Sequence, residues 1–221
     1  MFNDSLLLQD LFVAGSDTTA TTIEWAMAEL ICNPEKMKRA QAKLEEVVGH
    51  HRMVEESDAE RLPYLRAVVK EVFRLHPAVP FLIPHRADER CEIAGFVIPK
   101  HSQIIVNVWA IGRDPSIWKE PLKFMPERFL ENEMSSVEYR GQNFELIPFG
   151  AGRRVCVGLP LASRMVHLLL ASLLHSFEWA PPQGVSAEQV DMADRFGITL
   201  VKALPLAAIP TPCLPSEMYC Y

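Results

Sequence analysis

The sequence predicts a mainly α-helical fold with small β-sheets, an α+β architecture. Long stretches carry apolar side chains at helical spacing, whereas a few short stretches alternate between apolar and polar residues as strands do. Glycine and proline separate the two kinds of stretch. Of the 221 residues, 49% are hydrophobic and 23% are charged, which is typical of a globular chain and not of a disordered one.

The first predicted element is one long helix over residues 6–31, rich in Leu, Ala, Ile and Met. Asn33 and Pro34 restart the chain, because Asn suits an N-cap and Pro the first helical position. A second, charged helix is predicted over residues 35–48, and Gly49 is expected to end it.

Residues 50–61 are polar and are expected to be irregular. A third helix is predicted over residues 63–75, because its apolar side chains share one face at helical spacing: Leu65, Val68, Val69, Val72 and Phe73. Prolines then break the helix and favour an extended segment: Pro77, Pro80 and Pro84.

Residues 91–98 and 103–109 alternate in polarity and are predicted to form a hairpin joined by residues 99–102. Residues 112–152 show little periodicity, and so long an irregular stretch in a compact domain is usually functional. A last helix is predicted over residues 158–177, followed by a strand-like segment over residues 197–202 and a Pro-rich end.

Composition argues against several classes of protein. The net charge of -6 and the pI of about 5.7 disfavour a nucleic-acid binder, which needs a basic face. No uncharged apolar run reaches 18 residues, so no membrane span or leader is expected. An odd number of cysteines without C-x-x-C spacing argues against a disulfide framework: Cys32, Cys91, Cys156, Cys213 and Cys220.

The segment around Cys156 has the features of a thiolate site. Gly150, Gly152 and Gly158 permit tight turns that can aim backbone N–H groups at the sulfur. A predicted helix starts just after Cys156, and its positive end favours a thiolate over a thiol. The alternatives for an isolated Cys-x-Gly are a buried free cysteine and a nucleophile with His167 as its base.

The extended pattern F-x-x-G-x-R-x-C-x-G, from Phe149 to Gly158, resembles the haem-binding loop of the cytochrome P450 family at every defining position. The resemblance implies haem b as cofactor, with Cys156 as its axial thiolate ligand and Arg154 bound to a propionate. Phe149 is expected to cover one face of the ring, and Gly150 belongs to the same loop. Thiolate ligation donates electron density to iron and favours O–O cleavage.

The first upstream motif of the family is Ala14–Thr19 in the long helix. Gly15 costs about 1 kcal/mol inside a helix, which is acceptable if something must approach the backbone. Asp17 and Thr18 can compete for main-chain hydrogen bonds and open a groove. By resemblance the groove lies over the haem and holds oxygen, Thr18 delivers protons to that oxygen, and Asp17 is the acid of the relay. The alternative is a polar stripe with a capping Asp-Thr pair.

Two further motifs of the family are Glu71-Val-Phe-Arg74 and Pro126-Glu127-Arg128-Phe129. The i,i+3 spacing places Glu71 and Arg74 on one helix face. The resemblance implies that Arg128 joins them in a buried network near the haem-binding loop, with a structural role.

The resemblance suggests His85 as a second propionate partner, ahead of Arg86; the alternative for His85 is an ordinary surface histidine. It also implies that two mostly apolar segments, residues 78–83 and 197–199, face substrate, unless they are simple core packing. The sequence near residues 145–154 and 196–200 is similar to that of plant microsomal members of the geraniol hydroxylase-like group, which act on monoterpenoids and other small apolar compounds.

The function implied is a haem-dependent monooxygenase that activates O2 and hydroxylates a small apolar, terpenoid-like substrate. Electrons would come from NADPH through NADPH-cytochrome P450 reductase, docking near Cys156 on basic residues such as Arg153, Arg154 and Arg164. The complete enzyme would be anchored on the cytosolic face of the endoplasmic reticulum membrane.

Family members carry a larger N-terminal half with a membrane anchor, so residues 1–221 are expected to be one partial domain that starts at the oxygen-groove helix. A long helix without that half is expected to expose an apolar patch. The alternative function is therefore a truncated, non-catalytic fragment that keeps the haem-ligand loop but does not turn over alone.

Overall fold

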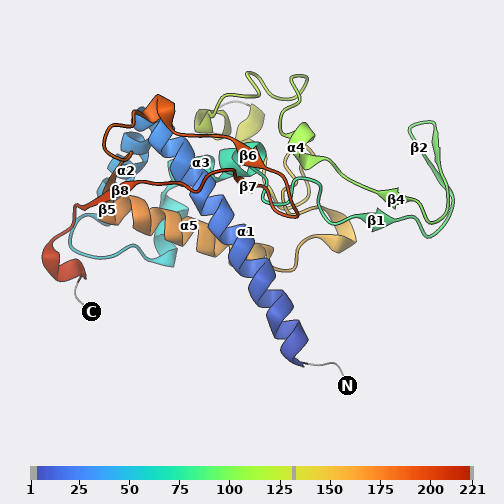
Figure 1. The fold of residues 1–221 in the computed structure, drawn as a ribbon, viewed down its shortest axis with the longest axis horizontal. Helices are drawn as coiled ribbons and strands as arrows, with labels where there is room; N and C mark the ends of the chain where they lie inside the picture. The colour runs from blue at the N-terminus through green and yellow to red at the C-terminus, as the bar shows by residue number, and fades with distance from the viewer. Residues whose placement is uncertain (1–3, 131–132, 220–221) are drawn as a thin grey trace.

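The computed structural model describes residues 4–130 and 133–219, and its fold is mainly helical with small sheets, as predicted. The four long helices are α1 (Asp4–Cys32), α2 (Pro34–Val48), α3 (Pro63–Leu75) and α5 (Leu159–Ser176). Each lies within two residues of its predicted bounds. Figure 1 shows α1 running the height of the molecule, with the other helices gathered around its C-terminal half.

The hydrophobic core lies where these four helices meet. Helix α3 is the central element, because nearly every side chain from Tyr64 to Leu75 is buried. The side chains with 0–1% exposure come from all four helices: Trp25, Leu30, Leu44, Leu65, Val68, Leu170 and Leu174. The core therefore fixes the relative positions of α1 and α3, which carry family motifs, and of α5, which follows the cysteine motif.

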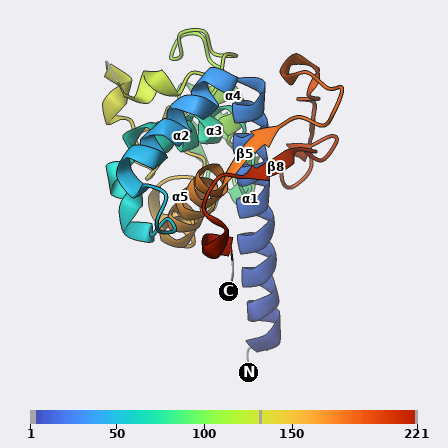
Figure 2. The ribbon, with the colours of Figure 1, turned by 90° about the vertical axis from the view of Figure 1, so that its left-hand side faces the viewer.

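The N-terminal half of α1 projects away from this core (Figure 2). The apolar side chains of residues 8–13 are exposed, with Phe12 at 75%, Val13 at 69%, Leu8 at 57% and Leu11 at 56%. The expected apolar patch on the long helix is thus present. Among the described residues, no helix is both long and apolar enough to cross a membrane.

The junction between α1 and α2 differs in detail from its prediction. Asn33 precedes the helix and Pro34 opens it, but the Asn33 side chain does not cap α2. Its Nδ2 donates backwards to the Glu29 carbonyl at 2.8 Å, so it closes the end of α1 instead. At the other end Gly49 stops α2 with a φ of 74°, as predicted, and its N–H donates to the Glu45 carbonyl at 2.9 Å.

The prediction of an irregular stretch over residues 50–61 was wrong for its second half, where a 3-10 helix, η1, runs from Glu56 to Arg61. A capping box forms it: the Glu55 N–H donates to Asp58 Oδ2 at 2.9 Å. Asp58 is only 1% exposed and also accepts two bonds from Arg52, at 2.6 and 2.7 Å, and one from Arg61. Polar residues thus order this segment without an apolar pattern.

The Asp58 cluster should make folding stability depend on pH. The Arg52 guanidinium and the other donors hold the pKa of Asp58 well below its usual range. The pKa of Asp58 is lower in the folded chain than in the unfolded chain, where it is about 3.9, so the ionised carboxylate stabilises the fold at pH values above 3.9. This stabilisation is lost as the pH falls towards the pKa of the folded chain. We expect Asp58→Asn to cost about 1–3 kcal/mol at pH 7 in urea unfolding, and much less near pH 2.

The control for this prediction is Glu60→Gln, because Glu60 is exposed in the same 3-10 helix. Its unfolding free energy should follow that of the unmodified chain at both pH values. A difference between Asp58→Asn and the unmodified chain that stays constant with pH would contradict the titration of Asp58.

The predicted hairpin between residues 91–98 and 103–109 was also wrong. The hairpin lies inside the first segment, where β2 (Cys91–Ile93) pairs with β3 (Phe96–Ile98). Ala94 and Gly95 form its turn with φ values of 50° and 82°, the two positive angles that a tight hairpin turn requires. Strand β4 (Gln103–Ile104) pairs instead with β1 (His85–Arg86), and α4 (Val108–Ile111) follows.

Two more two-stranded sheets lie in the C-terminal part. Strand β6 (Asp194–Arg195) pairs with β7 (Val201–Lys202), which occupies the end of the predicted strand. Strand β5 (Phe177–Ala180) pairs with β8 (Ile209–Pro212), inside the Pro-rich end where no strand was predicted. The stretch over residues 112–152 is largely irregular, as predicted, apart from short 3-10 turns: η2 (Pro126–Phe129) and η3 (Glu133–Ser136).

Candidate active site

The loop before α5 holds Cys156 in a tightly turned backbone. Gly150 and Gly152 have φ values of 73° and 66°, which favour glycine. A short 3-10 turn, η4 (Gly152–Arg154), follows, and the Cys156 N–H then donates to the Phe149 carbonyl at 3.0 Å. This bond closes the loop on itself, so the two glycines fix the place of Cys156.

Helix α5 begins three residues after Cys156, at Leu159. The Cys156 side chain is exposed, and a Cβ at Gly158 would lie 3.6 Å from its Sγ. The positive N-terminal end of α5 therefore lies close to the sulfur in sequence. The residues around the sulfur thus suit a thiolate ligand, and the exposed side chain is accessible to a metal held in a ring.

The other residues predicted to bind the cofactor differ in their exposure to solvent. The Arg154, Arg153 and His85 side chains are exposed, His85 in strand β1. Phe149 instead packs into the core, with its ring edge-on to Phe73 at 5.2 Å. The packing of Phe149 therefore supports the loop from the protein side.

The nucleophile alternative for Cys156 needs a histidine base within reach of the sulfur. His167 is buried, and its Nδ1 is 2.6 Å from the Ser163 carbonyl, one turn earlier in α5. Burial lowers the pKa of His167. Within residues 4–130 and 133–219 no hydrogen bond joins Cys156 to a histidine, so the arrangement favours a ligand cysteine over a nucleophile.

The motif in α1 leaves the helix continuous. Thr18 Oγ1 donates to the Ala14 carbonyl at 2.7 Å, and one turn later Thr22 Oγ1 donates to the Thr18 carbonyl at 2.8 Å. A Cβ added at Gly15 would meet no heavy atom of the described chain within 4 Å. Asp17 is exposed and Thr18 half-buried. The hydroxyl of Thr18 therefore bonds a main-chain carbonyl, as predicted, whereas α1 stays helical through Asp17 and Thr18 instead of opening there.

The network predicted for Glu71, Arg74 and Arg128 is present and buried. Arg74 donates to both Glu71 carboxylate oxygens, at 2.7 and 2.8 Å, and Arg128 Nε lies 3.1 Å from both. The Met125 N–H donates to Glu71 at 2.7 Å. The guanidinium groups also donate to main-chain carbonyls of the irregular stretch: Gly112, Pro121, Lys123 and Lys119. One carboxylate thereby ties α3 to residues 112–128.

Sequence reasoning missed the aromatic and polar side chains that support these motifs. Trp118 is 1% exposed, with its ring 5.3 Å from the Arg74 guanidinium and 5.9 Å from that of Arg128. Trp25 is 0% exposed and stacks on His76 with ring centroids 4.0 Å apart. The available signal was a tryptophan inside the predicted helix for Trp25, and a tryptophan inside a polar, Pro-flanked stretch for Trp118.

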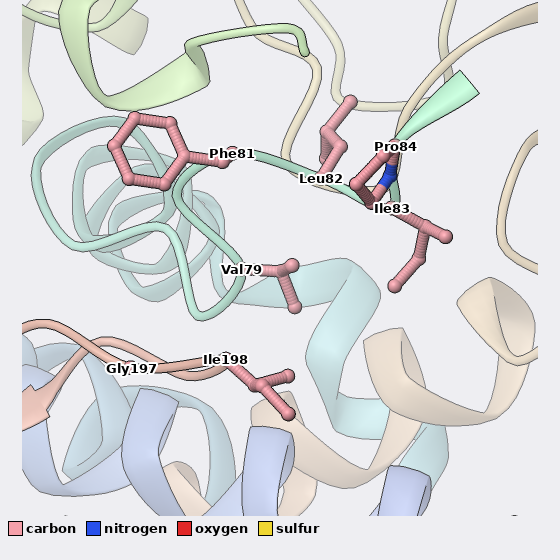
Figure 3. Close-up of a pocket in the computed structure, with 7 residues that line it drawn as sticks. All are labelled: Val79, Phe81, Leu82, Ile83, Pro84, Gly197 and Ile198. Carbon is pink, nitrogen blue, oxygen red and sulfur yellow. The ribbon is translucent and has the colours of Figure 1, made fainter. Parts of the chain in front are cut away.

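The two segments predicted to face substrate lie together and line one pocket (Figure 3). Residues 79–84 form one wall, residues 197 and 198 form the other, and the volume is about 270 Å³. Its side chains are apolar: Val79, Phe81, Leu82, Ile83, Pro84 and Ile198. The main chain joins the walls, because the Leu200 N–H donates to the Ala78 carbonyl at 2.9 Å.

The pocket is next to the cysteine loop. A Cβ at Gly150 would lie 3.7 Å from Leu82 Cδ1 and 3.9 Å from the Arg154 carbonyl. An exposed cysteine at a helix N-terminus, exposed cationic side chains and an adjacent apolar pocket together match the chemistry of a haem: iron, propionates and an apolar ring. The residues present therefore fit this cofactor.

Comparisons with known proteins agree with this geometry. The Cytochrome P450 family model matches residues 5–205. Geraniol 8-hydroxylase of Swertia mussotii is 59% identical over 203 residues, which are 92% of this chain and 40% of that protein. Geraniol 8-hydroxylase of Catharanthus roseus is 55% identical over 202 residues, 91% of this chain and 40% of the relative.

A solved zebra fish cytochrome P450 structure with abiraterone superposes with a TM-score of 0.84 at 38% identity. The match covers 96% of this chain and 48% of that one. The chain thus spans about 40% of the length of the curated relatives it matches. Together, the family model, these relatives and the shared fold show that this chain belongs to the cytochrome P450 family.

Proposed function

We propose that residues 1–221 form the C-terminal part of a haem-dependent monooxygenase that hydroxylates a small, apolar, terpenoid-like substrate. One observation carries the proposal: the loop that presents Cys156 lies, at Gly150, beside Leu82 of the apolar pocket built from residues 79–84 and 197–198. A metal ligand and a substrate pocket on one surface are what an oxygenase needs, since the oxygen must be transferred from metal to substrate over a short distance.

In this proposal Cys156 is the axial thiolate, Arg154 and His85 bind propionates, and Phe149 and Gly150 shape the loop. The exposed positions of Cys156, Arg154 and His85 are compatible with these roles. The haem, when bound, supplies the iron at which O2 is reductively cleaved. The core packing of Phe149 against Phe73 supports a role in stiffening the loop, alongside the predicted cover of the ring.

The proposed reaction consumes one O2, two electrons and two protons for each hydroxylation. One oxygen atom enters a C–H bond of the substrate, and the other leaves as water with the two protons. The Thr18 hydroxyl is the proposed proton donor to the oxygen, and Asp17 is the acid that resupplies Thr18 with protons. The half-buried hydroxyl of Thr18 and the exposed carboxylate of Asp17 suit a path from solvent to the site.

The substrate class follows from the pocket and the relatives. The lining is apolar, which suits an apolar ligand. Two relatives are named geraniol 8-hydroxylase, and geraniol is a monoterpenoid alcohol. Geraniol is therefore the first substrate to test.

The proposed electron source is NADPH through NADPH-cytochrome P450 reductase, with the complete enzyme at the endoplasmic reticulum membrane. Exposed Arg153 and Arg154 beside Cys156 would face an acidic reductase surface. Arg164 is also exposed, but it pairs with Glu56 at 3.2 Å and is partly engaged. Arg154 cannot serve a propionate and the reductase equally, so Arg153 is the better docking candidate.

The test is turnover with reductase, NADPH and geraniol. The product of the full transcript, loaded with haem, should form a hydroxylated geraniol carrying one atom of ¹⁸O from labelled O2. Label taken from water instead, or no NADPH-dependent product from haem-loaded folded protein, would refute monooxygenation of this substrate.

A second candidate function is a non-catalytic fragment that keeps the haem-ligand loop. The observation in its favour is the exposed apolar N-terminal half of α1, with Phe12 at 75% exposure. Such a surface favours aggregation and leaves a bound ring open to water. Purifying the 221-residue chain alone and measuring haem stoichiometry and turnover separates the two: bound haem without turnover supports the fragment.

Replacing Thr18 with alanine is expected to uncouple electron use from hydroxylation. The change removes the hydroxyl that donates to the Ala14 carbonyl, and with it the proposed proton donor. The product formed per NADPH should fall about tenfold or more, with the balance released as peroxide. Thr22→Ala is the matched control, because Thr22 makes the same bond to the Thr18 carbonyl one turn away. Equal coupling in the two variants would remove Thr18 from the relay.

A further inference from the structure

A tryptophan in α1 joins the two walls of the apolar pocket. Trp25 is 0% exposed, and its Nε1–H donates to the Leu200 carbonyl at 3.0 Å. The Leu200 N–H in turn donates to the Ala78 carbonyl at 2.9 Å. Leu200 is itself 0% exposed. Three segments far apart in sequence are therefore connected through both main-chain groups of one residue.

These two bonds lie directly beside the pocket. Ala78 precedes Val79, the first residue of one wall, and Leu200 follows Ile198 of the other wall by two residues. Figure 3 shows Val79 and Ile198 facing each other across the gap between the two segments. The distance between the walls is therefore set where Leu200 is held between Ala78 and Trp25.

Contacts on the indole hold Trp25 in turn. The His76 ring stacks on it, with centroids 4.0 Å apart and planes 6° from parallel. Lys202 Nζ lies 4.8 Å from the ring centroid. His76 and Lys202 stand two residues outside Ala78 and Leu200, so each wall segment also contacts the indole through a side chain.

The His76 ring is oriented by α1 as well. Its Nε2 lies 2.7 Å from Glu29 Oε1, one helical turn after Trp25. Glu29 and His76 are both buried. Two side chains of α1, Trp25 and Glu29, thus fix the segment that leads into the pocket wall, while Lys202 is retained at the other wall by the Asp191 carbonyl.

We infer that Trp25 is a positioning residue that sets the separation of the pocket walls and so tunes the size of the apolar substrate. It acts through the Leu200 and Ala78 backbone and is not one of the residues that line the pocket. The inference rests on the proposed function for the use of the pocket, but the hydrogen-bonded connection itself is independent of it.

The decisive experiment is hydrogen–deuterium exchange on Trp25→Phe, which keeps an aromatic ring but removes the indole N–H. Peptides covering residues 196–203 and 76–84 should exchange about tenfold faster than in the unmodified chain, because Leu200 loses its tether. Trp179→Phe is the matched control: the Trp179 Nε1–H donates to the Leu173 carbonyl at 2.9 Å, outside these segments. Unchanged exchange at residues 196–203 in folded Trp25→Phe overturns the inference.

A second variant covers the case in which phenylalanine does not fold. Replacing the Trp25 indole by its benzothiophene analogue preserves shape and stacking and removes only the N–H donor. The same faster exchange over residues 196–203 is expected, and unchanged exchange again overturns the inference.

Measuring geraniol binding to haem-loaded protein distinguishes the substrate proposal from the proposal about Trp25. The Kd from the optical titration should rise about 5- to 10-fold in Trp25→Phe and stay within about twofold in Trp179→Phe. The carbon monoxide spectrum should not change, because Cys156 is untouched. If the unmodified protein binds no geraniol, the substrate proposal fails, and the exchange result alone decides the role of Trp25. If Trp25→Phe and Trp179→Phe weaken geraniol binding equally, the positioning role of Trp25 is overturned.

Discussion

Replacing Cys156 with alanine is expected to abolish both the thiolate-type Soret band of the reduced carbon monoxide complex and the proposed NADPH-dependent hydroxylation. The loop contains one cysteine, Cys156. Its backbone N–H donates to the Phe149 carbonyl at 3.0 Å, which holds the residue in place. Losing the only thiolate of the loop removes electron donation to iron, which O–O cleavage needs.

Stability should hardly respond to this change. The Cys156 side chain is exposed, so alanine removes little buried surface and the unfolding free energy should stay within about 0.5 kcal/mol. Circular dichroism and urea unfolding of the haem-free chain measure this separately from the spectrum.

Cys91→Ser is the matched control, because Cys91 is also an exposed free cysteine, in strand β2. This variant should keep both the Soret band and turnover. A normal thiolate-type band in Cys156→Ala, or its loss in Cys91→Ser alone, would move the ligand away from Cys156.

Replacing Glu71 with alanine is expected to cost about 3–5 kcal/mol of unfolding free energy, enough to unfold much of the chain. Glu71 and Arg74 are both fully buried, and Arg128 is 7% exposed at its side chain. Removing the single carboxylate leaves two guanidinium groups without a counter-charge in the interior. The Met125 N–H also loses its acceptor.

The consequence should extend to the cofactor. The Glu71 network joins α3 to residues 112–128, and α3 carries Phe73, against which Phe149 of the cysteine loop packs. We therefore expect Glu71→Ala to lower haem occupancy as well as stability, measured by denaturant unfolding and by the haem-to-protein absorbance ratio.

An exposed ion pair provides the control. Glu46 pairs with Lys43 on α2 with both side chains largely exposed, so Glu46→Ala should cost about 0–1 kcal/mol and leave haem occupancy unchanged. If Glu71→Ala were no more destabilising than Glu46→Ala, the network would not be the structural element proposed.

The helices of this protein are predictable because their signals are local. The apolar face of α3 and the Pro residues that open α2 and α3 determine where these helices start and which side is buried. The polar segments were less predictable. The 3-10 helix of residues 56–61 depends on bonds from Arg52 and Arg61 to one buried carboxylate, which a hydrophobic pattern does not report.

The strand predictions failed for a related reason. Alternation identified extended chain over residues 91–98 but not the turn within it, where Ala94 takes a positive φ that alanine rarely adopts. Strand β8 can contain Pro210 and Pro212 because its sheet has two strands, β5 and β8, so β8 is an edge strand, where proline is tolerated. Pairing of such short strands is decided by which segments meet, and that is a property of the whole fold.

By itself the sequence determined the chemistry of the candidate site: a cysteine between glycines ahead of a helix, an Asp-Thr pair inside another helix, and a Glu-Arg-Arg set spread over 58 residues, from Glu71 to Arg128. Tertiary structure alone decided their surroundings. It placed Leu82 against Gly150, joined Ala78 to Leu200, and put Trp25 behind both pocket walls. The bond between Trp25 and Leu200 spans 175 positions, and contacts of that range depend on how the core packs, which no local pattern encodes.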